Sequence, residues 1–77
     1  MKVFAFITKD IDPKTDMCFN DRRANIYEIK NNTPKLIGYT SYFQEDREED
    51  ETKVLAALVR GGFVSKNRTG YKIIRIN

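Results

Sequence analysis

Two sets of acidic residues in this sequence have spacings that occur at metal sites. Asp10, Asp12 and Asp16 form a D-x-D-x-x-x-D pattern, a group of acids that suggests comparison with a calcium-binding loop. The glycine and the closing bidentate glutamate of such a loop are missing from the sequence. We therefore favour an Asx-type turn, in which the aspartates bond to nearby backbone groups.

The second set combines Asp12 or Asp21 with Glu28 and Lys30. This D…E-x-K spacing is used by metal-dependent nucleases, where two carboxylates hold a divalent ion and the lysine assists the attacking water. The same Glu-x-Lys pattern on an exposed strand is ordinary cross-strand charge pairing. Nuclease folds of that kind also need a longer chain, so we predict no metal site.

The composition also argues against general acid–base, zinc and cysteine catalysis. The sequence has no histidine, which is the commonest general base near neutral pH and the commonest zinc ligand. Cys18 is the only cysteine, so no internal disulfide can form, and a thiol without a histidine is not set up as a nucleophile. We expect a protein that is not an enzyme, binds no cofactor and works in a reducing compartment.

The chain has 77 residues, which is enough for one domain (1–77) with one small core. Its first apolar run is too short, and is followed too soon by Lys9 and Asp10, for a signal peptide or a membrane span. We predict a cytoplasmic protein that makes no contact with a membrane.

The first half of the sequence predicts three strands. Residues 2–8 are rich in valine, phenylalanine and isoleucine on both faces, which indicates a central strand. Residues 9–23 carry turn chemistry, so we expect a long loop there. Within it, Met17, Cys18 and Phe19 form an apolar patch that fits either the core or an exposed anchor for a partner.

Residues 24–43 predict an antiparallel hairpin. Its strands are 24–30 and 35–43, and Asn31 and Asn32 tolerate the positive φ that a tight turn needs. Pro34 closes the turn. Gly38 is bare where a larger side chain would usually pack, so it marks either a bulge or a place where another backbone comes close.

Residues 47–60 predict one helix that packs on the sheet. Asp46 as N-cap and Glu49 three residues later match a capping box, and Arg60 suits the negative end of the helix dipole. A glycine, Gly61 or Gly62, supplies the left-handed residue that ends the helix. One apolar stripe faces the core and comprises Val54, Leu55, Leu58 and Val59.

The last segment predicts a second, basic hairpin over residues 63–76. Residues 63–65 are expected to pair with 71–76 across a loop in which Gly70 takes the left-handed position. The expected order is therefore β-β-β-α-β-β, an α+β domain with one helix on a mostly antiparallel sheet.

Charge is distributed unevenly along the chain. Residues 45–51 hold six acids and one arginine, a local charge of −5 within a net charge of +3. Residues 52–77 hold six bases and no acid. Such a layout can steer a protein toward a polyanion or an oppositely charged protein, although acids at a helix start need no partner to explain them.

A small domain with tyrosines on its sheet and two oppositely charged ends is typical of a docking module or inhibitor. We expect a non-enzymatic protein that docks on a larger protein or nucleoprotein machine, as small phage and mobile-element accessory proteins do. The alternative is a nucleic-acid-binding protein that uses the basic hairpin, and a homodimer through a sheet edge is a further option. The expected contact residues are Lys66, Arg68, Tyr71, Lys72, Arg75, Arg22, Arg23, Tyr39, Tyr42, Glu45, Glu48 and Glu49.

Overall fold

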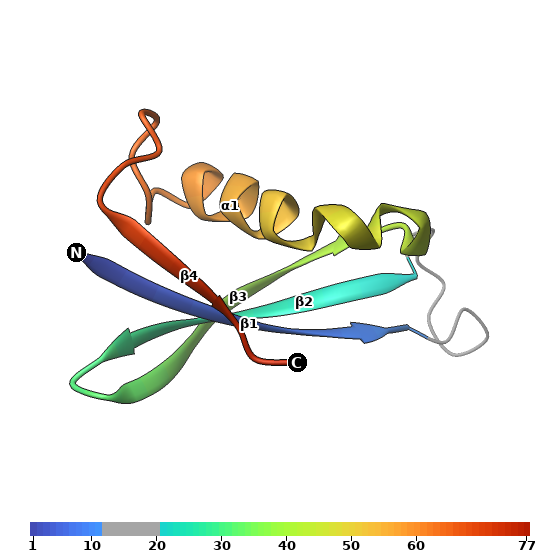
Figure 1. The fold of residues 1–77 in the computed structure, drawn as a ribbon, viewed down its shortest axis with the longest axis horizontal. Coiled ribbons are helices and arrows are strands. Elements are labelled where there is room, and N and C mark those ends of the chain that lie inside the picture. The colour runs from blue at the N-terminus through green and yellow to red at the C-terminus, as the bar shows by residue number, and fades with distance from the viewer. Residues whose placement is uncertain (12–20) are drawn as a thin grey trace.

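The computed structural model describes residues 1–11 and 21–77, apart from the side chain of Arg47. One helix crosses one face of a four-stranded sheet (Figure 1). This confirms the predicted α+β class. Along the chain the elements are β1 (Lys2–Asp10), β2 (Arg22–Lys30), β3 (Thr33–Tyr42), the 3₁₀ helix η1 (Gln44–Glu49), α1 (Asp50–Arg60) and β4 (Tyr71–Arg75).

The sheet has the order β3-β2-β1-β4 and is mixed. β1 pairs antiparallel with β2, and β2 pairs antiparallel with β3, whereas β4 pairs parallel with β1. β1 is therefore an inner strand, as its two apolar faces predict. Phe4 and Phe6 of β1 are fully buried under α1.

The β2–β3 hairpin is confirmed, with longer strands than predicted. Asn31 and Asn32 have φ values of 53° and 60°, so the connection is a two-residue turn of the kind that asparagines favour. Pro34 lies inside β3, where it is tolerated because β3 is an edge strand. The register shifts between Ile26 and Tyr27, opposite Gly38 and Leu36, which fits the bulge of the two alternatives given for Gly38. No other described backbone comes close, because a Cβ added at Gly38 would meet nothing within 4 Å.

The helix begins at Asp50, three residues later than predicted. Residues 44–49 form η1 instead, and Asp46 lies inside it with φ −91° and ψ 17°. The predicted capping box is wrong, because the N-cap is Glu49 and no side-chain cap bond forms. At the other end Gly62 takes φ +80°, as a glycine stop requires.

The predicted C-terminal hairpin is wrong. Residues 61–70 form turns, and β4 pairs with β1 rather than with residues 63–65. The reason is that Phe63 and Val64 close the end of α1: both backbone N–H groups donate to the carbonyl of Leu58. Phe63 also packs edge-on against Phe4, with ring centroids 6.4 Å apart. These apolar residues serve the core, so they do not form a strand.

The predicted loop 9–23 is wrong at both of its ends, because the flanking strands extend into it. Lys9 and Asp10 belong to β1, and Arg22 and Arg23 belong to β2. The patch predicted at residues 17–19 lies outside the described residues. Among the described residues, no helix has the length and apolar character needed to cross a membrane.

The core lies between α1 and one face of the sheet. Val54 and Leu58 of the predicted helix stripe are buried, and Leu55 and Val59 pack against them from the margins. From the strands the core receives Phe4, Phe6, Ala24, Ile26 and Tyr42, and from the turn after α1 it receives Val64.

We predict that Leu58→Ala lowers the free energy of unfolding by about 2–5 kcal/mol, because Leu58 is 1% exposed and the substitution leaves a cavity. The matched control is Leu36→Ala, where the leucine is 59% exposed, and its cost should stay within about 0.5 kcal/mol. Urea denaturation followed by circular dichroism measures both. Equal effects of the two substitutions would contradict the helix-on-sheet core.

Candidate functional site

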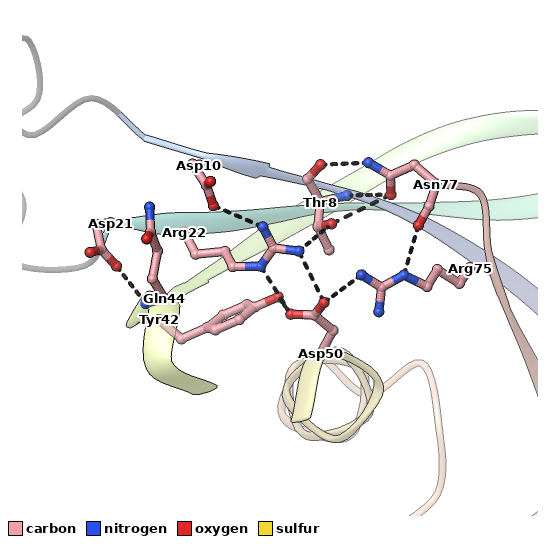
Figure 2. A network of polar contacts seen from close by, with 9 residues as sticks. All are labelled: Thr8, Asp10, Asp21, Arg22, Tyr42, Gln44, Asp50, Arg75 and Asn77. Carbon is pink, nitrogen blue, oxygen red and sulfur yellow. Dashed lines mark hydrogen bonds and ion pairs between the residues drawn. The ribbon is translucent and has the colours of Figure 1, made fainter. Parts of the chain in front are cut away.

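A network of polar side chains joins the start of α1 to the sheet (Figure 2). Its centre is the carboxylate of Asp50, which is 1% exposed. Arg22 of β2 binds it in a bidentate manner: Nε donates to Oδ1 at 3.2 Å and Nη2 donates to Oδ2 at 3.1 Å. Tyr42 of β3 donates its hydroxyl to Oδ1, and Arg75 of β4 lies 2.8 Å from Oδ2.

Further residues hold the two arginines in place. Arg22 also donates to Asp10 at 2.9 Å and to the hydroxyl of Thr8 at 2.7 Å. The amide of Asn77 brackets Thr8, accepting from its backbone N–H at 3.0 Å and donating to its carbonyl at 2.7 Å. Arg75 donates through Nε to the carbonyl of Asn77 at 2.7 Å. The network therefore ties α1 to all four strands.

The network shifts the pKa values of its central groups. Burial alone would raise the pKa of Asp50, but hydrogen bonds from Arg22 and Tyr42 and the charges of the arginines outweigh it and lower that pKa. Burial and the neighbouring carboxylate raise the pKa of Tyr42 to about 12. The hydrogen bond to Asp50 raises the pKa of Arg22 despite its burial. Asp50 and Arg22 stay charged and Tyr42 stays neutral at pH 7.

This network is built for positioning. The carboxylate is closed to solvent, and the groups around it already satisfy both of its oxygens. A buried charge pair of this kind fixes one arrangement of the elements that carry it, because any other leaves a charge unpaired. The network therefore holds α1 on one face of the sheet.

The opposite face of the sheet carries no helix in the part of the chain that the structure describes (Figure 1). Side chains alternate along each strand, so the pairing registers place one set of residues there, which we call the open face. The open face comprises Val3, Ala5, Ile7 and Lys9 of β1, Arg23, Asn25, Tyr27 and Ile29 of β2, Pro34, Leu36, Tyr39 and Ser41 of β3, and Lys72 and Ile74 of β4.

Large apolar side chains of the open face are exposed. Leu36 is 59%, Tyr39 61% and Ile74 39% exposed, and Ile76, directly after β4, is exposed as well. Val3, Ile7, Tyr27 and Ile29 are half-buried between them. Exposed apolar surface of this kind is uncommon on proteins that act alone.

The charges on the open face all have one sign. Lys9, Arg23 and Lys72 are cationic, and none of the other open-face positions holds an acidic residue. The guanidinium of Arg23 lies over the ring of Tyr39, 4.2 Å from its centroid. The Nε of Arg23 is buried and has no hydrogen-bond partner among the described residues.

The structure divides the predicted contact residues among three places. Arg23, Tyr39 and Lys72 lie on the open face, with Lys72 beside Val3 at the other end of β1 from Lys9, the partner of Arg23. Arg22 and Tyr42 are buried around Asp50, and Arg75, whose side chain is 42% exposed, pairs with the same carboxylate. The remaining six lie elsewhere: Lys66 and Arg68 in the exposed turns after α1, Tyr71 half-buried on the helix side of β4, and Glu45, Glu48 and Glu49 on η1.

Sequence reasoning does not select Lys9, Asn25, Leu36 or Ile74 as contact residues. Their signal is the strand alternation, but it identifies an open face only when the sheet order and the side of the helix are known. The predicted absence of a metal site stays a prediction. Among residues 1–11 and 21–77, no cluster of three acidic or cysteine side chains could hold an ion.

No protein-family model matches this chain, and comparison with curated proteins and with solved structures finds no match. The function is therefore inferred from the geometry of the network and of the open face.

We predict that Asp50→Asn lowers the free energy of unfolding by about 3–5 kcal/mol at pH 7, because it leaves two arginines without their buried anion. Since folding lowers the pKa of Asp50, its stabilising effect is complete above the unfolded value of about 3.9 and is lost as pH falls through the folded value. The wild type should therefore lose stability on acidification more steeply than the variant. Urea denaturation at a series of pH values measures this difference.

The matched control is Glu48→Gln, which removes an exposed carboxylate from η1 and should leave stability nearly unchanged. Should Asp50→Asn fail to fold, Tyr42→Phe removes one hydrogen bond to the same carboxylate, at a cost of about 1.5–3 kcal/mol. Wild-type stability in both variants would contradict the positioning role of the network.

Proposed function

We propose that this chain is a non-enzymatic binding protein that docks on a larger protein or nucleoprotein complex through its open face. The observation that carries the proposal is the exposed apolar surface of a sheet whose other face is already covered by α1. A partner that covers Leu36, Tyr39 and Ile74 removes apolar area from water, which is the main source of association energy.

The composition of the sheet supports this proposal. β1 is apolar on both faces, and β4 runs parallel to it. Strands in parallel pairs are usually covered on both faces, whereas purely antiparallel sheets often leave one face to water. The open face has the composition of a half-buried layer, and a docked partner would complete that layer.

Charge supports an anionic partner. Cations at the margins of the open face accelerate the encounter with a negatively charged surface and disfavour a positively charged one. The exposed acids of η1 lie in the helix layer rather than on this face (Figure 1). A partner on the open face therefore meets lysine and arginine without interference from the acidic run.

We predict that replacing Leu36 and Ile74 together by serine weakens docking by about 2 kcal/mol or more, because the two side chains are apolar contacts of the open face. The immobilised protein is incubated with lysate of its native cells, and retained components are quantified by mass spectrometry. The control carries Thr52→Ser and Arg60→Ser, two exposed positions on α1, and should retain the same components as the wild type.

The same experiment with nuclease treatment separates two kinds of partner. Components that remain after nuclease contact the chain as proteins, and components that disappear are held through nucleic acid. Equal retention by the wild type and by the variant that lacks Leu36 and Ile74 would contradict docking through the open face.

A further inference from the structure

One corner of the open face brings two cations together. Lys9 of β1 and Arg23 of β2 are direct cross-strand partners on the same face. Like charges in this arrangement destabilise a sheet, and no carboxylate among the described open-face residues offsets them. Such a cost is compensated when an anion binds between the two side chains.

The same corner pairs a cation with an aromatic ring. The guanidinium carbon of Arg23 lies over the ring of Tyr39, 4.2 Å from its centroid, which is a cation–π contact. Its neighbour Arg22 binds two carboxylates, whereas Arg23 forms no ion pair with the other described residues. Tyr39 remains 61% exposed beside it. Planar guanidinium groups and tyrosine rings are the surfaces on which unpaired bases stack.

Beyond Arg23, the next open-face residues of β2 are an amide and a second aromatic ring, which can contact the bases of a nucleotide chain. Asn25 lies directly opposite Tyr39, and Tyr27 follows on the same face. Residues two apart on a strand are about 6.7 Å apart, so a cation, an amide and a second ring succeed one another at regular intervals. An amide can bond to the edge of a base, and the ring offers a second stacking surface.

A carboxylate by itself would satisfy Arg23 and Lys9 but has no group that stacks on the two rings or donates a hydrogen bond to Asn25. A single nucleic-acid strand matches all of them, since it combines phosphates with flat, edge-polar bases. A duplex does not, because its bases are stacked on one another and offer no free face to the Arg23–Tyr39 pair.

From this geometry we infer that the corner formed by Lys9, Arg23 and Tyr39 binds single-stranded nucleic acid, with backbone phosphates on the two cations and a base on the Arg23–Tyr39 pair. The inference rests on the proposed function and names the partner class for the open face.

The test is fluorescence anisotropy of a labelled oligothymidylate of about 12 nucleotides, a length within the range of single-strand-binding domains. Removing both cations with Lys9→Gln and Arg23→Gln should weaken binding about tenfold or more. The negative slope of log K against log salt should become shallower by about 1.4, which is about 0.7 for each phosphate that is no longer neutralised. Tyr39→Leu should weaken binding about tenfold with an unchanged salt slope, because it removes stacking but no charge.

The matched control for charge is Lys53→Gln with Arg60→Gln, two cations of α1 on the other side of the sheet. It should retain near wild-type affinity. Circular dichroism verifies that each variant is folded. A titration of the wild type followed by amide chemical shifts needs no substitution and should move the resonances of Lys9, Arg23, Asn25 and Tyr39.

Three outcomes would overturn the inference: no binding of the oligonucleotide by the wild type at low salt, equal weakening by the control pair and by the corner pair, or tighter binding of polyglutamate than of the oligonucleotide with the same dependence on Arg23. The last would assign the corner to an acidic protein. Docking that depends on Leu36 and Ile74 without oligonucleotide binding refutes only this inference. Oligonucleotide binding at the corner without that dependence refutes the proposed docking through the apolar part of the face.

Discussion

The buried carboxylate of Asp50 is the constraint on which the arrangement of this molecule depends. It is the first residue of α1, and its contacts reach β2, β3 and β4 through Arg22, Tyr42 and Arg75. An unpaired charge in that interior would be costly, so the helix has one position in which the charges are satisfied. That position lays the apolar stripe of α1 on the phenylalanines of β1. Polar and apolar interactions thus select the same face of the sheet.

Because α1 covers one face of the sheet, the open face stays exposed to solvent in the described structure. The described residues of this 77-residue chain form one α-helix, which covers one face of the sheet. No described helix covers the apolar residues on the other face of β1 and β2. The same division separates the charges: the acids of η1 and α1 belong to the helix layer, whereas Lys9, Arg23 and Lys72 belong to the open face. The proposed binding surface is the part of the sheet that the fold leaves uncovered.

Local patterns predict the elements of this fold better than their partners. The alternation in β1, the turn between β2 and β3 and the stripe of α1 depend on short-range chemistry, and all three are confirmed. The prediction of a C-terminal hairpin is wrong because apolar residues such as Phe63 and Val64 suit either a strand or the core. In this fold they pack at the end of α1 and do not pair with β4. Asp50 belongs to the acidic run, and nothing within residues 45–51 shows that its carboxylate binds Arg22. Which residues share the open face depends on sheet order, and no local pattern contains that information.

In this structure α1 covers one face of the sheet and leaves the open face exposed. Paramagnetic relaxation of methyl groups by a water-soluble probe measures the exposure of both faces directly in solution. We expect strong relaxation of the methyl groups of Leu36 and Ile74 and weak relaxation of those of Val54 and Leu58. Equal protection of all four residues in the isolated chain would contradict a bare face, because the open face would then be covered without a partner.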